Sequence, residues 1–337
     1  MSADLRSALD RDMPELLRAT KVASASIAVI ARGRLAYAAA YGDQAPGVAA
    51  TPTTLYNIAS LTKPLTAEII LRLASARRLS LDEPMARYWT DPDIAGDDRQ
   101  TLLTPRLALS HQTGFPNWRD ARTGLHFDHA PGTAWGYSGE GYQYAARFAQ
   151  ARTGTAFETL AQRYLFGPVG MTHTTYTHRP WLVGHITLPN EAGRSLEPTI
   201  GKRFNAADSV YSTPTDYARF LTDVLADRGL SPAISKERNR SQVSMRDTAC
   251  GGVKAASCPP VVGFGLGWQI LVFGGDTVMM HTGKDEGVFT FAYLDRARGD
   301  GLVLFTNSGD GYRLVLPILE RLHADPGYLR FLRGQID

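Results

Sequence analysis

Long apolar runs, repeats and a strong charge bias are all missing from this chain of 337 residues. No apolar stretch approaches the length needed to cross a bilayer, so the sequence predicts no membrane span. The net charge is only +3 and is dispersed along the chain, which argues against nucleic acid as a partner. Without repeats or low-complexity tracts, the composition of 44% hydrophobic and 20% charged residues fits a soluble enzyme with one large or two moderate cores.

The N-terminus lacks the basic start and the apolar core of a signal peptide. The segment from Ala3 to Ala19 shows instead the leucine spacing of an amphipathic helix. The sequence as written therefore predicts a cytoplasmic protein, or a periplasmic or secreted one if a leader has been removed.

Cysteine is also scarce, with only Cys250 and Cys258 in a loop that contains Gly-Gly and Pro-Pro. A disulfide can close such a short loop in an oxidising compartment, and two unpaired thiols fit the sequence equally well. His126, Asp128 and His129 share another loop, but a metal needs a further donor in defined geometry. We therefore expect neither a metal nor another cofactor.

A serine precedes a lysine by three residues at one place, Ser60 and Lys63, where a helical pattern begins. A serine hydroxyl is a poor nucleophile unless a base takes its proton, and a lysine can do so when desolvation or nearby cations lower its pKa. Apolar spacing predicts a helix from Leu61 to Leu79, with Ser60 at its N-terminus and Lys63 on the same face. Taken alone, these residues also fit a helix cap and a solvated lysine.

Two later segments contain residues that such a nucleophile needs. Tyr137 lies in the turn-rich loop 131–139, ahead of a helical pattern from Gly141 to Ala151. The sequence His281-Thr282-Gly283 ends an apolar run, where glycine permits close approach of a substrate and the polar side chains offer hydrogen bonds. Seen alone, Tyr137 also fits a half-buried aromatic residue, and the Thr-Gly pair an ordinary turn.

In this order and spacing, the three segments resemble the motifs of the serine β-lactamase and penicillin-binding-protein superfamily, above all its class C-like branch. That branch includes class C β-lactamases, D-Ala-D-Ala carboxypeptidases, D-aminopeptidases, β-lactamase-like carboxylesterases and a few acyltransferases. Its second motif is Tyr-x-Asn, and His-Thr-Gly replaces Lys-Thr-Gly in several members. Further similar segments, between about residues 24 and 320, are Tyr56-Asn57-Ile58-Ala59, Leu109-Ser110-His111-Gln112-Thr113-Gly114, Gly167-Pro168-Val169-Gly170-Met171, Tyr211-Ser212-Thr213-Pro214-Thr215-Asp216 and Gly265-Leu266-Gly267-Trp268.

The chain departs from the family pattern at Gly139, where the second motif usually has asparagine. In the family, the amide of that asparagine helps to bind the acylamide carbonyl of the substrate and orders the lysine. We therefore expect simple esters to be cleaved better than β-lactams or D-Ala-D-Ala peptides, unless Glu140 or Gln143 reaches the same carbonyl. Lys284 follows the third motif, where the resemblance implies the second backbone N–H of the oxyanion hole.

The hydrophobic period predicts an α+β fold, in which residues 1–59 and 261–337 form an antiparallel sheet flanked by helices and residues 60–260 form a mainly helical region inserted between them. The resemblance implies that this fold is of the β-lactamase/transpeptidase-like type, with the active site in the cleft between the two regions. The predicted strands are Val22–Ala31, Leu35–Tyr41, Gly265–Val272, Thr277–Met280, Val288–Leu294 and Leu302–Thr306, and the C-terminal helix is Tyr312–His323.

Together, the residues and the resemblance predict a metal-independent serine hydrolase of a small ester, amide or peptide. Ser60 would attack the carbonyl, with Lys63 and Tyr137 handling the proton. The oxyanion would lie at the N–H groups of Ser60 and Lys284. The remaining substrate-binding residues of this prediction are His281, Thr282, Gly283 and Gly139.

Several alternatives stay open. An acyltransferase would use the same acyl-enzyme, and a penicillin sensor would acylate once without turnover. His111 is expected to be structural, while Asp285 and Glu286 line the pocket mouth or are solvated loop charges. The natural substrate, whether ester, D-amino-acid peptide or β-lactam, and the oligomeric state are not fixed by the motifs.

Overall fold

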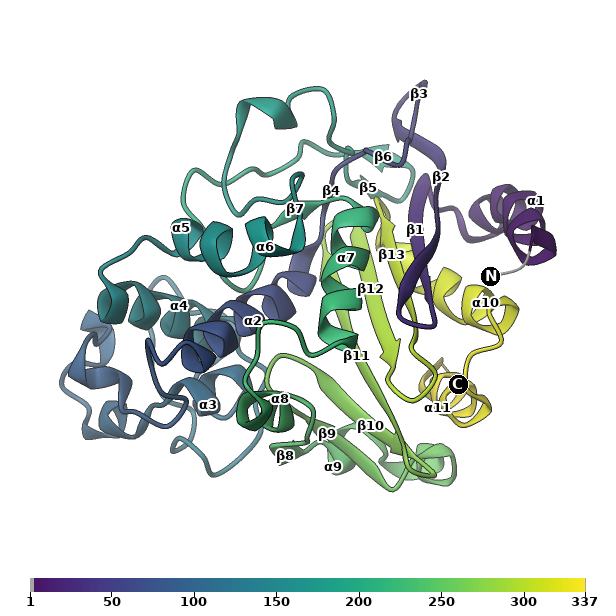
Figure 1. Ribbon diagram of the computed structural model, residues 1–337. Helices are drawn as coiled ribbons and strands as arrows, with labels where there is room; N and C mark the ends of the chain where they lie inside the picture. Colours follow the sequence, from purple (N-terminus) through teal and green to yellow (C-terminus); the bar gives the residue numbers. More distant parts are fainter. Residues whose placement is uncertain (1–2, 337) are drawn as a thin grey trace.

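A nine-stranded antiparallel sheet forms the centre of the molecule, in the order β3-β2-β1-β13-β12-β11-β10-β9-β8 (Figure 1). The computed structural model describes residues 3–336. Both ends of the chain supply strands, and β1 pairs with β13 in the middle of the sheet. The strands are β1 Ser24–Ala31, β2 Arg34–Ala45, β3 Val48–Ala49, β8 Val243–Ser244, β9 Val261–Phe264, β10 Gln269–Phe273, β11 Asp276–Asp285, β12 Val288–Asp295 and β13 Asp300–Thr306.

The two faces of the sheet belong to two separate hydrophobic cores, because side chains alternate along each strand. On β1, Ile27 packs into one core and Ala28 into the other. The first core lies under α1 (Ala3–Thr20), α10 (Val315–Arg321) and α11 (Pro326–Ile336), which Figure 1 shows together with both chain ends on one side of the sheet.

Helix α7 (Pro214–Leu225) packs on the opposite face of the sheet (Figure 1). The second core on this face extends into a larger, mainly helical part of the molecule. Its central helix is α2 (Thr62–Ser75), in which every residue from Thr62 to Leu73 is buried. The other helices are α3 Pro105–Leu109, α4 Gly139–Thr153, α5 Phe157–Ala161, α6 Gly167–Val169, α8 Pro232–Arg238 and α9 Arg246–Ala249. There are also two short strand pairs, in which β4 Tyr56–Asn57 pairs with β7 Tyr211–Ser212 and β5 Asn190–Glu191 pairs with β6 Arg194–Ser195.

Buried ion pairs fix α2 against its neighbours. Glu68 on α2 accepts hydrogen bonds from Arg72, at 3.2 Å, and from Arg238 of α8, at 3.0 Å. Arg72 also pairs with Asp223 of α7. Removing one partner of such a network leaves a buried charge uncompensated, so this cluster holds α2 in one position.

Some element boundaries differ from the sequence prediction. Helix α2 ends at Ser75 rather than Leu79, and Arg77 beyond it takes a left-handed backbone with φ 55°. The strand predicted from Gly265 begins only at Gln269, because residues 265–268 form the turn between β9 and β10, with Gly267 at φ 95°. The strand predicted as Thr277–Met280 extends through the third motif to Asp285.

The C-terminal region also differs. The helix predicted as Tyr312–His323 is a 3₁₀ turn, Gly309–Leu314, followed by α10. The last helix, α11, was not predicted. In the loop before β9, Cys250 and Cys258 form a disulfide with their Cα atoms 5.9 Å apart, which decides between the two alternatives left open by the sequence.

Candidate active site

Ser60 and Lys63 lie in direct contact at the start of α2. Lys63 Nζ donates a hydrogen bond of 2.9 Å to Ser60 Oγ and another of 2.9 Å to the carbonyl oxygen of Ala207. Ser60 belongs to a 3₁₀ turn, Ala59–Leu61, that runs directly into the helix, so the spacing of three brings both side chains to one face. Ser60 is partly exposed, whereas the Lys63 side chain is fully buried.

The burial of Lys63 changes its acid–base behaviour. Desolvation lowers the pKa of Lys63 from 10.5 to about 7, and attraction to the Asp208 carboxylate partly opposes this shift. A neutral lysine amine is therefore present near neutral pH. Together with the 2.9 Å contact to Ser60 Oγ, this is the arrangement that a general base for a serine requires.

The turn before Ser60 is held in an unusual backbone conformation. Ala59 has φ 46°, in the left-handed region that residues with a Cβ rarely adopt. Its N–H donates a 2.9 Å hydrogen bond to Asn57 Oδ1, and the amide of Asn57 donates to Asp285 on β11 at 3.2 Å. On the other side, Thr290 Oγ1 donates to the carbonyl oxygen of Ile58 at 2.8 Å. These bonds tie the turn that carries Ser60 to β11 and β12.

Gly283 allows β11 to approach this turn. A Cβ at Gly283 would lie 2.3 Å from Thr290 Oγ1, 2.6 Å from the Ile58 carbonyl oxygen and 3.0 Å from the Ser60 nitrogen. Strand β10 pairs with β11 only as far as Met280. Within the described chain, the β11 edge from residue 281 to 285 therefore has no strand partner on that side.

Tyr137 packs against Lys63 from the loop that precedes α4. Lys63 Nζ lies 4.7 Å from the centre of the Tyr137 ring. Desolvation raises the pKa of Tyr137 above its ordinary value, while a hydrogen bond to Ser60 acts in the opposite direction. The phenol therefore stays protonated at neutral pH and can donate a proton or a hydrogen bond toward Ser60.

His111 and His281 flank this tyrosine as neutral rings. The ring centre of His111 lies 4.3 Å from that of Tyr137, and the ring centre of His281 lies 6.3 Å away. Burial, with the nearby charge of Lys63, lowers the pKa of His281 to about 3 and places that of His111 well below its usual range. His111 Nδ1 accepts from the Ser138 N–H at 3.0 Å, which leaves its proton on Nε2.

His281 has the opposite tautomer. Its Nδ1 lies 2.7 Å from the carbonyl oxygen of Thr282 and donates to it, so Nε2 carries a lone pair. Within the described chain, Nε2 is buried and has no hydrogen-bond partner. The third motif therefore offers a neutral acceptor rather than a cation at neutral pH.

The position that usually holds an asparagine is covered by a tryptophan. Gly139 begins α4, and a Cβ there would lie 2.6 to 2.9 Å from three ring carbons of Trp118. The same indole lies over Lys63, with Nζ 5.9 Å from the ring centre. Of the two alternatives to the missing amide, Glu140 pairs with Arg119, whereas Gln143 accepts from the Ala206 N–H through Oε1, a bond that does not use its Nε2 donor.

Two contributors to the site were missed at the sequence level. Trp118 follows the segment ending at Gly114 that carried part of the resemblance, but its contact with Gly139 depends on loop geometry. Asp208 comes directly after Ala207, the acceptor for Lys63. Burial and the neighbouring Asp285 raise the pKa of Asp208, and the charge of Lys63 lowers it. No motif marked either residue.

The remaining predicted residues are more peripheral. Thr282, Lys284 and Glu286 are exposed, at the end of β11 and in the turn that follows. His126 Nε2 lies 3.2 Å from an oxygen of Asp128. Over residues 3–336, no group of three or more His, Cys, Asp or Glu side chains is arranged to hold a metal ion. None of the helices in that range is both long and apolar enough to cross a membrane.

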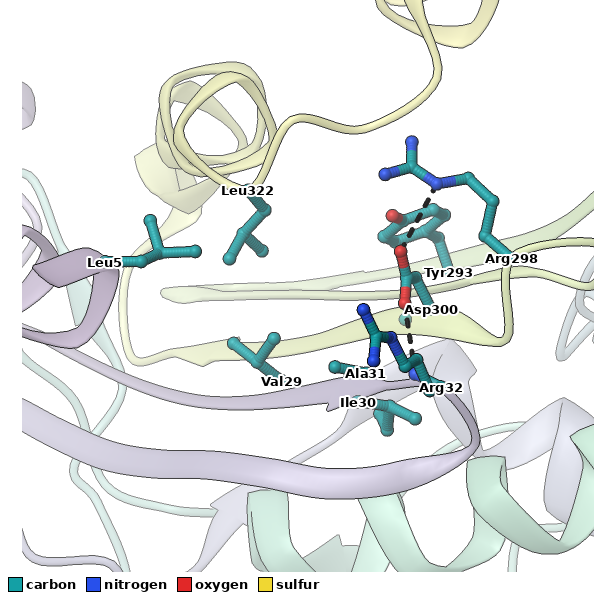
Figure 2. Close-up of a pocket in the computed structure, with 10 residues that line it drawn as sticks. Leu5, Val29, Ile30, Ala31, Arg32, Tyr293, Arg298, Asp300 and Leu322 are labelled. Carbon is teal, nitrogen blue, oxygen red and sulfur yellow. Dashed lines mark hydrogen bonds and ion pairs between the residues drawn. The ribbon is translucent and has the colours of Figure 1, made fainter. Parts of the chain in front are cut away.

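A cavity of about 430 Å³ lies far from this serine, between α1, β1 and the ends of β12 and β13 (Figure 2). Leu5, Val29 and Leu322 form its apolar side, and Arg298 pairs with Asp300 at 3.3 Å. None of the described residues that line it is a serine, cysteine or histidine.

Comparison with known proteins identifies the family of this chain. The family model described as Beta-lactamase matches residues 9–325, so the chain belongs to the beta-lactamase family. Protein flp of Staphylococcus aureus (strain MW2) is 23% identical over 343 residues, covering 96% of this chain and 67% of that protein. Unguisins hydrolase ungD of Aspergillus violaceofuscus (strain CBS 115571) is 24% identical, and the match covers 91% of this chain but only 62% of that protein.

Solved structures share the fold. The octameric penicillin-binding protein homologue from Pyrococcus abyssi has a TM-score of 0.78 at 20% identity, covering 95% of this chain and 78% of that chain. The D-alanine carboxypeptidase AmpC from Burkholderia cenocepacia has a TM-score of 0.76 at 20% identity, covering 95% and 98%. The predicted α+β, β-lactamase/transpeptidase-like fold is confirmed.

Proposed function

We propose that this chain is a serine hydrolase that cleaves a small ester or amide through an acyl-enzyme on Ser60. The observation that carries the proposal is the 2.9 Å hydrogen bond between Lys63 Nζ and Ser60 Oγ, made by a lysine that is fully buried. Proteins of the beta-lactamase superfamily are generally serine hydrolases, which supports the same class of activity.

In the proposed acylation step, Ser60 Oγ attacks the substrate carbonyl while neutral Lys63 takes the hydroxyl proton. The new Oγ–C bond forms and the carbonyl becomes an oxyanion at the N–H groups of Ser60 and Lys284. The bond to the leaving group then breaks, and the proton reaches that group through Lys63 and Tyr137. A water molecule attacks the acyl-enzyme in the reverse sense and restores the Ser60 hydroxyl.

The proposed cleft lies where four segments meet around Ser60. They are the start of α2, the loop that carries Tyr137, the free edge of β11 and the segment around Ala207. The two parts of the chain expected from sequence, residues 1–59 with 261–337 and residues 60–260, would contribute opposite walls. Thr282, exposed on β11, would orient the substrate, while the buried ring of His281 would pack beside Tyr137.

Within this class, we propose that simple esters are the preferred substrates. A β-lactam or a D-Ala-D-Ala peptide carries a carboxylate, and the neutral His281 provides no positive charge for it at neutral pH. Gly139 has no side chain to donate to an acylamide carbonyl. The leaving group of an activated ester needs little protonation, so an ester depends less on these missing contacts than an amide does.

The test is a panel of p-nitrophenyl butyrate, a D-Ala-D-Ala peptide and nitrocefin with the wild type and Ser60→Ala. We expect turnover of the ester to exceed that of the other two and to vanish in the variant. Product yields with and without added alcohol or amine separate hydrolysis from acyl transfer, and a single burst without turnover would identify a sensor. A wild type that hydrolyses nitrocefin or the peptide more efficiently than the ester contradicts the proposed preference.

A further inference from the structure

We propose that Trp118 determines which acyl groups the site accepts, by filling the space beside Gly139 with an apolar wall that favours apolar acyl chains over acylamides. The inference rests on the proposed function, because it concerns the acyl group that Ser60 would carry. It adds a residue from outside the three motifs, on a loop that sequence patterns do not place at the site.

The first observation is the contact with Gly139. Three atoms of the six-membered ring of Trp118 lie 2.6, 2.7 and 2.9 Å from the position of a Cβ at Gly139. Contacts this short are not tolerated between carbon atoms, so any side chain at position 139 must displace the indole. The glycine and the tryptophan are therefore a matched pair: the indole can lie there only because position 139 has no side chain.

The second observation is the place of the ring relative to the nucleophile. The ring centre lies 5.9 Å from Lys63 Nζ, and Nζ lies 2.9 Å from Ser60 Oγ. The indole and Ser60 Oγ thus both lie near the Lys63 amine, and we infer that the ring borders the space that an acyl group on Ser60 would occupy. Trp118 is 43% exposed, so part of its surface remains available to a ligand.

The third observation is that the loop is anchored on both sides of Trp118. The Gly139 N–H donates to Asn117, at 3.0 Å to its carbonyl oxygen and at 2.9 Å to its Oδ1. On the other side, Arg119 pairs with the buried Glu140 at 2.8 Å and with Asp91 at 2.8 Å. Asn117 and Arg119 are thus both bonded to the first turn of α4. Because the residues on either side of Trp118 are fixed in this way, the loop holds the indole in position.

An indole offers a broad apolar face, and its one donor cannot reproduce the amide group of an asparagine at position 139. Apolar chains gain from burial against such a face. An acylamide in the same place loses water from its carbonyl and N–H, and it pays the cost of any hydrogen bond left unmade. The difference between the two acyl types is therefore expected to depend on Trp118.

The experiment compares two esters with the same leaving group and the same chain length, p-nitrophenyl pentanoate and p-nitrophenyl N-acetylglycinate, each corrected for uncatalysed hydrolysis. The readout is the ratio of their kcat/KM values, because a uniform loss of active enzyme cancels in a ratio. We expect the wild type to prefer the pentanoate and Trp118→Ala to reduce this preference about tenfold. Trp181→Ala, which removes another partly exposed tryptophan (37% exposed), is the matched control and should leave the ratio unchanged.

Gly139→Ala tests the matched pair without adding a hydrogen-bond donor. We expect it to reduce the pentanoate preference when Trp118 is present, because the new methyl group displaces the indole. In the Trp118→Ala background, the same substitution should have little further effect on the ratio.

Two results would overturn the inference: an unchanged ratio in Trp118→Ala, or equal effects of Gly139→Ala with and without Trp118. Labelling of Ser60 by a small alkyl fluorophosphonate, measured in every variant, separates this inference from the proposed function. If Ser60 is labelled in every variant but Trp118→Ala leaves the kcat/KM ratio unchanged, only the role of Trp118 is rejected. If the wild type is not labelled at Ser60, the proposed function itself is rejected.

Discussion

The backbone of Gly283 lies so close to the turn that carries Ser60 that a Cβ on this residue would be 3.0 Å from the Ser60 nitrogen. The same missing side chain makes room for the hydroxyl of Thr290, its partner across the β11–β12 pair, to reach the Ile58 carbonyl oxygen at 2.8 Å. The glycine of the third motif thus brings β11 and the Ser60 N–H together at one place. This is the geometry from which an oxyanion hole is built.

Gly283→Ala is therefore expected to impair both activity and stability. The added methyl group should push β11 away from Ser60 and lower kcat/KM for p-nitrophenyl butyrate by about a hundredfold, as the loss of an oxyanion donor does. Overpacking should also destabilise the fold by about 1–3 kcal/mol. Gly96→Ala is the matched control, because a Cβ at Gly96 has no neighbour within 4 Å. Equal activity of the two variants would contradict this account of Gly283.

The sequence predicted the central strands of the sheet because they have distinct hydrophobic periods, whereas β3, β8 and β9 were not predicted. Strands β1, β12 and β13 lie where their apolar runs were found, and the helix after Ser60 begins where the pattern placed it. Boundaries set by backbone geometry were less predictable. The end of α2 depends on a left-handed residue, Arg77, and no side-chain pattern marks such a position.

At the candidate site, residues adjacent in a motif were easier to identify than residues brought together by folding. Ser60 and Lys63 were found because one helical turn separates them. Trp118, Asp208 and Thr290 come from three other segments, and each acts through contacts with a backbone or a charge distant in sequence. Such contacts leave no periodic signal in a single sequence.

Lys63→Met is expected to abolish acylation and yet to stabilise the protein. A buried amine is costly, and a methionine of similar length removes that cost, so we expect a gain on the order of a few kcal/mol in the free energy of unfolding at neutral pH. Burial lowers the pKa of Lys63 from 10.5 to about 7, so between these values the unfolded chain binds more protons than the folded one. Wild-type stability should therefore rise with pH across this window.

Thermal unfolding at several pH values checks this prediction. The difference in stability between Lys63→Met and the wild type should be largest below pH 7 and should narrow as the pH rises. A difference that does not change with pH would mean that Lys63 is not buried as an amine of low pKa.

Lys63 and Tyr137 are expected to act as one proton-handling unit. Lys63→Ala and Tyr137→Phe should each lower the acylation rate by about two to four orders of magnitude, the range for general acid–base groups. Because both residues would transfer the same proton, the acylation rate of the double variant should fall by much less than the product of the two single decreases. Single-turnover kinetics with a p-nitrophenyl ester gives these rates, and multiplicative losses would show that the two residues act independently.

The pH dependence of kcat/KM should follow the deprotonation of the Lys63 amine. Activity on esters should rise with a midpoint near the lowered pKa of Lys63, about 7, because only the neutral amine accepts the Ser60 proton. The raised pKa of Tyr137 means that the phenol should not cause a decline below about pH 10.

Asp208→Asn tests the origin of that midpoint. The Asp208 carboxylate favours the charged form of Lys63 and so raises its pKa, whereas the nearby His111 and His281 stay neutral. Removing the carboxylate should move the midpoint to lower pH by about one unit. A midpoint that is unchanged or moves to higher pH would contradict the assignment of the titrating group to Lys63.

The most direct test of the account is intact-mass spectrometry with peptide mapping, on wild type and Ser60→Ala, after reaction with a fluorophosphonate and with a slowly hydrolysed ester. Ser60→Ala should remain folded, since the Ser60 side chain caps no helix and the loss of its hydrogen bond with Lys63 costs only about 1 kcal/mol. We predict one adduct per wild-type chain, located on Ser60, and none on the variant. An adduct on another residue, or turnover retained by Ser60→Ala, would contradict the proposed acyl-enzyme.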